Sequence, residues 1–291
     1  SIITTSFLCW KLRKEIDVVH FCNYTTHIWR LPKTIEVIVT IHDLMFITCN
    51  DFYNSSRFQL LKTLYFKFLV NIAINNCSVL QTVSEYTRGN IITNFPKSKE
   101  KRILVSAPLA DKSSIASNVD VSWLAESRYL VYVGSDRSHK KLSWIIEEIN
   151  NQKQSNFVLF VIGANESSTG LSSNVRFLQN VSDTELQNIY RYAEANILMS
   201  IDEGYGLSVK EAASNMCITV LPMEPHFKQF DDLEIVWINR RSGLTETFAK
   251  LWDMSRDDIT SQKLSVLQRY QTSIHSDEHI RSIYKGLLTH G

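Results

Sequence analysis

Short apolar runs alternate with helical patterns along most of this chain, first over residues 17–105 and again from residue 129 onward. These runs lack the two-residue alternation of a half-exposed strand, which is typical of strands buried on both faces. Strands that alternate with helices predict parallel sheets with right-handed crossovers. The runs that predict strands are residues 17–21, 35–41, 79–83, 102–105, 129–133, 157–162, 175–178, 196–199, 217–220 and 234–237.

The helices are predicted from apolar spacing and from capping residues. Residues 58–75 carry apolar side chains at helical spacing. Ser84 is a predicted N-cap for a helix that reaches about residue 94. Ser182 and Glu185 form a predicted capping box. Further helices are expected at residues 142–150, 182–193, from 207, and in the tail from 243.

A polar stretch without periodicity separates the two blocks and predicts a linker. We therefore expect an α/β fold of two Rossmann-like domains whose parallel sheets face a central cleft. The expected boundaries are a first domain over residues 1–110, a linker over 111–127, and a second domain over 128–291. The first block shows no opening strand with a Gly-rich turn before Asp17, so we expect that domain to be incomplete.

Composition excludes several classes of protein. With 31 basic and 30 acidic residues, the chain has no positive excess that would favour a nucleic-acid partner. Its five cysteines are scattered and never in C-x-x-C spacing, which favours reduced thiols in the cytoplasm over disulfides or a zinc site. No run reaches the roughly 20 apolar residues that span a bilayer.

The strongest local signal is the segment from Asp202 to Ala212, in which Gly204 and Gly206 lie between a strand end and a helix start. Glycines allow close approach of a ligand to the backbone, and the first amides of a helix attract an anion such as a diphosphate. Glu203 and Glu211 flank this turn and could accept hydrogen bonds from hydroxyl groups. The alternative is an ordinary turn with solvated or capping glutamates.

A second signal follows the strand at residues 129–133. Gly134 is followed by Ser135, Asp136, Arg137, Ser138, His139, Lys140 and Lys141, again before a predicted helix. Cationic side chains there would stabilise the negative charge of a departing diphosphate. The alternative is a solvated basic loop.

Together these segments resemble glycosyltransferase family 4, the retaining enzymes of the GT-B fold, and especially its bacterial mannosyltransferase-like members. Glu203 and Glu211 match the E-x₇-E motif of that family, with Gly-Tyr-Gly between them. The other matching segments are residues 129–142, 175–193, 41–44 (Ile-His-Asp-Leu) and 83–87 (Val-Ser-Glu-Tyr-Thr).

The resemblance implies roles for individual residues. Lys140 would bind the donor diphosphate, Glu203 would contact the transferred sugar, and Glu211 would hold the ribose. His42 would orient sugar hydroxyls or stabilise the transition state; a lone histidine is otherwise a structural residue. Catalytic roles thus fall on Glu203, His42 and Lys140. The implied donor-binding set is Gly134, Ser135, Arg137, His139, Lys140, Gly204, Tyr205, Gly206, Leu207, Ser208 and Glu211.

The resemblance implies transfer of a hexose, first of all mannose, from a GDP- or UDP-linked donor to a glycan or lipid-linked acceptor. It implies no cofactor and no catalytic metal. The sequence departs from the family at His139, Lys141 and Ser135, where relatives carry Arg, Asn and often Arg. These departures support a second interpretation, a non-catalytic nucleotide-sugar-binding subunit or an inactive fragment. A two-lobed epimerase or phosphorylase is a third.

The predicted helix that begins at Phe58 mixes aromatic residues with Lys62 and Lys67 over residues 58–70. One interpretation is peripheral contact with a membrane, at the inner face of the plasma membrane, where a lipid-linked acceptor would lie. The other, which the pattern favours, is a helix packed on its own sheet.

Overall fold

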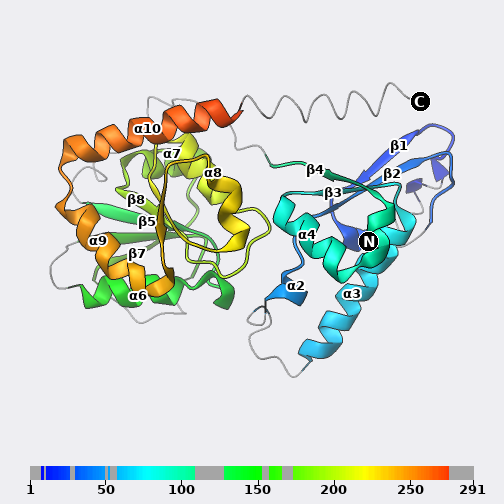
Figure 1. Cartoon of the computed structure of the whole chain (residues 1–291), viewed down its shortest axis with the longest axis horizontal. Helices are drawn as coiled ribbons and strands as arrows, with labels where there is room; N and C mark the ends of the chain where they lie inside the picture. Colours follow the sequence, from blue (N-terminus) through cyan, green and yellow to red (C-terminus); the bar gives the residue numbers. More distant parts are fainter. Residues whose placement is uncertain are drawn as a thin grey trace. The chain divides into compact units, whose positions relative to one another are not determined.

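The computed structural model describes residues 8–9, 11–26, 30–49, 52, 58–108, 128–152, 157–165 and 173–274. The chain forms two compact units, coloured from blue to cyan and from green to red in Figure 1. The first contains the chain up to Pro108 and also the short segment Asp202–Tyr205; the second contains Leu109–Ile201 and Gly206–Ser276. The predicted linker, residues 111–127, lies outside the described residues.

The first unit is built on a parallel sheet with the strand order β1-β2-β3-β4. Its strands are β1 (Val18–Phe21), β2 (Glu36–Ile41), β3 (Val79–Thr82) and β4 (Arg102–Val105). The helical segments are η1 (Tyr24–Thr26), α2 (Met45–Thr48), α3 (Gln59–Asn76), α4 (Glu85–Asn94) and η3 (Pro96–Glu100). Val37, Val39 and Ile41 of β2 are buried against Val70, Ala73 and Ile74 of α3, which forms the core of this unit.

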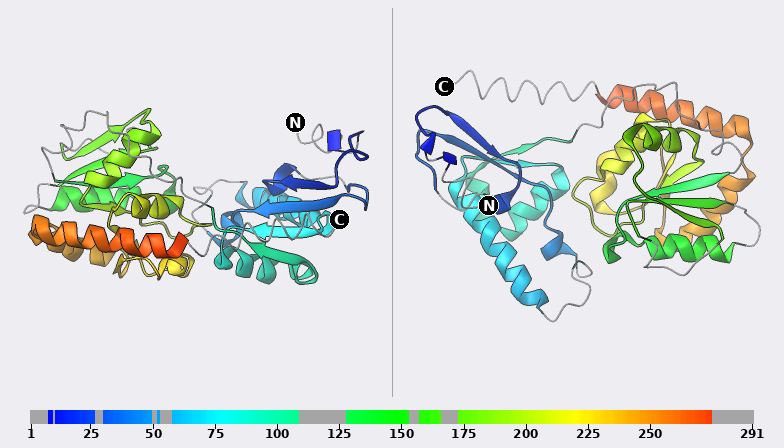
Figure 2. Two further views of the ribbon diagram at one scale, coloured as in Figure 1. Left: turned by 90° about the horizontal axis from the view of Figure 1, so that it is seen from above. Right: turned by 180° about the vertical axis from the view of Figure 1, so that it is seen from behind.

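The second unit is built on a parallel sheet with the order β10-β9-β8-β5-β6-β7. Its strands are β5 (Tyr129–Val133), β6 (Val158–Ile162), β7 (Val175–Leu178), β8 (Ala195–Ile197), β9 (Thr219–Pro222) and β10 (Ile235–Ile238). Helices cover both faces of this sheet, with α6 and α9 on one side and α7, α8 and α10 on the other (Figures 1 and 2). They are η4 (Ser138–Lys140), α6 (Leu142–Asn151), α7 (Asp183–Tyr192), α8 (Leu207–Ser214), η6 (Pro225–Phe230), η7 (Arg240–Gly243), α9 (Leu244–Asp253) and α10 (Arg256–Ile274).

The two parallel sheets confirm the predicted α/β fold class. The predicted caps are also confirmed. The Ser84 side chain accepts a hydrogen bond from the Thr87 amide at 3.1 Å, and Ser182 and Glu185 form the full capping box. The largest displacement is β9, which begins two residues after the predicted start at Cys217. Its partner β8 pairs only with Thr219 and Val220, so Pro222, which has no amide hydrogen, ends the strand without breaking the ladder to β8.

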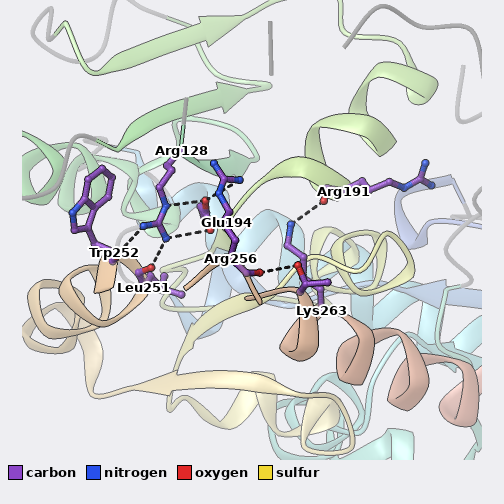
Figure 3. A network of polar contacts seen from close by, with 8 residues as sticks. Arg128, Arg191, Glu194, Leu251, Trp252, Arg256 and Lys263 are labelled. Carbon is purple, nitrogen blue, oxygen red and sulfur yellow. Dashed lines mark hydrogen bonds and ion pairs between the residues drawn. The ribbon is translucent and has the colours of Figure 1, made fainter. Parts of the chain in front are cut away.

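A buried charge network joins three elements of the second unit (Figure 3). Arg128, directly before β5, donates to the Glu194 carboxylate at 3.0 Å and to the carbonyls of Leu251 and Trp252 at 2.6 and 2.5 Å. Its guanidinium also lies over the rings of Phe157 and Trp252. The Glu194 side chain is only 3% exposed and that of Arg128 19%, so solvent screens this pair weakly.

We predict that Glu194→Gln lowers the free energy of unfolding by about 3 kcal/mol, because it leaves the Arg128 guanidinium without its buried countercharge. Urea denaturation followed by circular dichroism measures the change. The control is Glu246→Gln, which removes a pair with Lys250 between two exposed side chains and should leave the unfolding curve almost unchanged. Equal effects of the two substitutions would contradict a structural role for the Arg128–Glu194 pair.

Candidate functional site

The residues that the sequence singles out fall into two groups, one in each compact unit. In the second unit they lie on the loops that follow β5 and β8, which are neighbouring strands of the sheet. In the first unit they comprise His42, after β2, and the segment Asp202–Tyr205.

The loop after β5 is held by its backbone. The Gly134 amide donates to the Ile162 carbonyl at the end of β6 over 2.9 Å, and the Tyr132 hydroxyl donates to the Ser135 carbonyl over 2.6 Å. The chain then forms η4, and Lys141, in the left-handed conformation with φ +52°, starts α6. Local bonds therefore fix the path of the backbone from Gly134 to Lys141.

The basic side chains of this loop have different environments. The His139 side chain is 1% exposed and so belongs to the interior. The Lys141 ammonium lies 5.2 Å from the centroid of the Trp144 ring. Arg137 is exposed and Lys140 is half-buried. The loop is therefore not a uniformly solvated run of charges: Arg137 is its exposed cation, and Lys140 and Lys141 are both half-buried.

Gly206 opens α8 on the loop after β8. Its φ of +94° lies in the left-handed region, and a Cβ there would lie 3.3 Å from the Phe230 ring and 3.5 Å from that of Phe227. Glycine meets both demands, since it adopts positive φ at no cost and has no side chain. The first amides of a helix have no acceptor within it, and at the start of α8 these are the amides of Leu207 and Ser208.

These two loops touch through the backbone. The Ile201 amide donates to the His139 carbonyl over 2.9 Å, which ties the residue after Ser200 to η4. His226 also bonds through Nε2 to the Ser200 carbonyl over 3.2 Å. The structure thus brings the Gly134–Lys140 loop next to the strand end that leads to α8. That the Lys140 ammonium and the first amides of α8 bind the same diphosphate stays a prediction.

Glu211 lies in the second turn of α8 and is half-buried. Burial raises the pKa of Tyr190 in α7 well above its ordinary value, and the nearby Glu211 carboxylate adds to the rise. Tyr190 therefore keeps its proton. A carboxylate beside a neutral, buried phenol is suited to accept hydrogen bonds from hydroxyl groups of a ligand.

In the first unit, His42 follows β2 directly and is exposed. Its Nε2 donates to the Cys22 carbonyl over 2.8 Å, which fixes the orientation of the ring. The Asp43 carboxylate accepts a hydrogen bond over 3.1 Å from the amide of Met45, the first residue of α2. His42 is therefore a surface histidine whose ring is held by the backbone after β1.

Helices α2 and α4 of the first unit hold the segment Asp202–Tyr205 through hydrogen bonds from Thr48, Tyr86 and the N-cap Ser84. We call this arrangement the clasp. The Asp202 carboxylate accepts from the hydroxyls of Thr48 in α2 and Tyr86 in α4. The Gly204 carbonyl accepts from the Ser84 hydroxyl over 2.7 Å. A Cβ at position 204 would lie 2.4 Å from the His42 carbonyl oxygen, so only glycine allows this approach.

Glu203 lies between these two anchored residues. It is 6% exposed, which does not fit the alternative of a solvated glutamate. Burial raises the pKa of Asp202, and the bonds from Thr48 and Tyr86 oppose that rise. The clasp therefore holds the backbone on both sides of Glu203.

Sequence reasoning missed most of the clasp. Ser84 was identified only as a helix cap, and Thr48, Tyr86 and Asp202 were given no role. Their partners lie 120 residues away for Ser84 and 154 for Thr48, beyond any local pattern. The one signal was the motif at residues 83–87, which contains Ser84 and begins directly after the carboxyl end of β3. Within the described ranges, no cluster of three or more His, Cys, Asp or Glu could hold a metal ion.

The sequence and the fold were compared with known proteins. Residues 119–224 match the family model described as Glycosyl transferases group 1. The chain is 28% identical over 206 residues to the O-antigen chain mannosyltransferase RfbU of Salmonella typhimurium, covering 67% of this chain and 54% of that protein. It is 22% identical over 234 residues to O-antigen chain mannosyltransferase B of Escherichia coli, covering 70% and 57%.

Among solved structures, the Anabaena protein Alr3699/HepE in complex with UDP-glucose is similar to this chain with a TM-score of 0.73. The identity is 11%, and the match covers 98% of this chain and 82% of that one. This likeness establishes the fold alone. The chain spans about half the length of the two curated relatives. It therefore has the GT-B fold, and its residues 119–224 are similar to the glycosyl transferases group 1 family.

Proposed function

We propose that this chain is a retaining glycosyltransferase of family 4 that moves a hexose, in the first place mannose, from a nucleotide diphosphate sugar to a glycan or lipid-linked acceptor. The family match supports transfer of a glycosyl group. The names of the two curated relatives support mannose and a polysaccharide product. The UDP-glucose bound to the Anabaena protein supports a nucleotide-linked donor, for which GDP and UDP are the candidate nucleotides.

The observation that carries the proposal is the start of α8 at Gly206. A left-handed glycine turns the chain so that the amides of Leu207 and Ser208 point out of the helix end. The leaving group of the reaction is a nucleoside diphosphate, whose negative charge grows as the bond to the sugar breaks. Helix amides and the ammonium of Lys140 would stabilise that charge without reorganisation.

The other residues complete this proposal. Glu203 would accept hydrogen bonds from the transferred sugar, and Glu211 would hold the ribose hydroxyls. His42 would orient the sugar or stabilise the transition state. Gly134, Ser135, Arg137 and Tyr205 would line the donor through backbone or side chain.

One observation favours the rival, a non-catalytic nucleotide-sugar-binding protein. His139 takes the place of a family arginine and is buried, so it would not meet a phosphate as an exposed cation. Lys141 is engaged with Trp144. Calorimetric titration with GDP and UDP, followed by assays for hydrolysis and transfer with GDP-mannose and UDP-glucose, separates the two functions. Binding without turnover would support the rival.

We predict that Lys140→Met lowers kcat for transfer by about 100-fold, because one charged partner of the leaving diphosphate is lost. It should also weaken the binding of GDP or UDP in calorimetry. The control is Lys97→Met on η3, an exposed lysine with no proposed role, which should leave both unchanged. Wild-type turnover in the Lys140→Met protein would remove the ammonium from the mechanism.

We predict a second effect at the clasp, where Ser84 acts as a positioning residue for Glu203. Ser84→Ala removes the bond to the Gly204 carbonyl and should lower kcat about tenfold, the equivalent of one hydrogen bond. Ser84→Thr keeps a hydroxyl that can both cap α4 and donate, and should restore the rate.

The nucleotide Kd separates this positioning role from a loss of structure. It should stay the same in the Ala and Thr variants of Ser84, because Gly206 and the start of α8 are untouched. If Ser84→Ala weakened nucleotide binding as much as it slowed transfer, the residue would stabilise the fold and not the position of Glu203.

A further inference from the structure

The first half of α3 exposes an unusual amount of apolar surface. Five large side chains of this half are between 53% and 70% exposed: Leu60, Leu61, Leu64, Tyr65 and Phe68. Residues at i, i+1, i+4, i+5 and i+8 lie on one side of a helix, so the five form a single stripe. An exposed apolar patch of this kind on a folded protein marks a contact site for another protein, a membrane or a ligand.

The orientation of the stripe is fixed by the opposite side of the helix. The Thr63 hydroxyl donates to the Phe46 carbonyl of α2 over 3.3 Å, and the rings of Phe66 and Phe46 lie 5.4 Å apart. In the second half of α3, Leu69, Val70, Ala73 and Ile74 are buried in the core of the first unit. The packed-helix interpretation therefore holds for this side and for the second half, but not for the stripe. Figures 1 and 2 show the first turns of α3 extending past the sheet.

The charged residues of α3 itself are all of one sign. Lys62 and Lys67 are exposed and lie at its two borders on the helical wheel. No Asp or Glu occurs anywhere from Phe52 to Ser84, in a chain with 30 acidic residues. Lysines at the edge of an apolar helix face extend their ammonium groups toward anionic headgroups while their stems stay in the apolar layer. Tyr65 has the apolar ring and polar tip that suit the same boundary.

We propose that the stripe of α3 binds the surface of an anionic lipid bilayer, with Leu60, Leu61, Leu64, Tyr65 and Phe68 inserted and Lys62 and Lys67 at the headgroups. The helix would lie in the interface and not cross it, since none in the described part of the chain is long and apolar enough to span a membrane. The charge pattern favours lipid over a second copy of this chain. A symmetric contact through the stripe would bring lysines of the two copies together without an acidic residue of α3 to neutralise them.

This inference goes beyond the proposed transferase activity and is tested without it. The full chain is mixed with vesicles of phosphatidylcholine and phosphatidylglycerol in a 1:1 ratio, and with phosphatidylcholine vesicles alone, and the bound fraction is measured by co-sedimentation. We expect binding to the mixed vesicles that weakens as salt rises, and much weaker binding to the neutral ones. Leu60→Ser with Leu64→Ser should lower the partition coefficient at least about tenfold, since two inserted side chains are lost.

The matched control is Leu264→Ser, an equally exposed leucine on α10, which should leave binding unchanged. Lys62→Gln with Lys67→Gln should weaken binding to the anionic vesicles and leave the weak binding to neutral vesicles as it is. Circular dichroism and nucleotide binding of each variant show whether the fold and the proposed donor site persist.

Three results would overturn the proposal. One is the absence of sedimentation with anionic vesicles. Another is equal loss of binding in the Leu60/Leu64 and Leu264 variants. The third is a concentration-dependent dimer, seen in analytical ultracentrifugation, that the Leu60/Leu64 variant abolishes, because a second copy would then cover the stripe.

Discussion

The approach of the Gly204 backbone to the His42 carbonyl is the contact on which the arrangement around Glu203 depends. No side chain fits at position 204, since even a Cβ would lie 2.4 Å from that oxygen. The absence of a side chain lets the Ser84 hydroxyl reach the Gly204 carbonyl and lets α2 and α4 hold Asp202. The backbone on both sides of Glu203 is therefore held in place, and a rigid backbone lowers the entropy that contacts of a side chain with a ligand would cost.

Fewer cationic side chains of the second unit are available to an anion than the sequence of the loop indicates. Of the residues from Arg137 to Lys141, His139 is turned into the interior and Lys141 is over Trp144. The stabilisation of an anion at this end of the sheet would therefore depend on Lys140, Arg137 and the backbone amides at the start of α8. Helix amides are fixed dipoles that lose no side-chain entropy on binding, so a site that relies on them needs few cations.

Much of the fold could be predicted from the sequence, because buried parallel strands and capped helices leave local patterns. The segments at β4, β5 and β7 were predicted at their observed bounds, and Ser84 and Ser182 cap the helices expected of them. The clasp could not be predicted, since its hydrogen bonds join residues more than 100 positions apart. For the apolar stripe of α3, the sequence pattern left two interpretations open, contact with a membrane and packing on the sheet. Large apolar side chains are usually buried, and only the exposed fractions of these five show that one side of the first half of the helix faces outward.

The contacts of Arg128 have a consequence for the order in which the second unit is completed during synthesis. This side chain precedes the first strand of the unit, yet its acceptors lie 66 and 124 residues later, at Glu194 and Trp252. Contacts of such separation close only after the intervening chain has been made. The carbonyls of Leu251 and Trp252 in α9 are thus the last partners of the guanidinium to be synthesised.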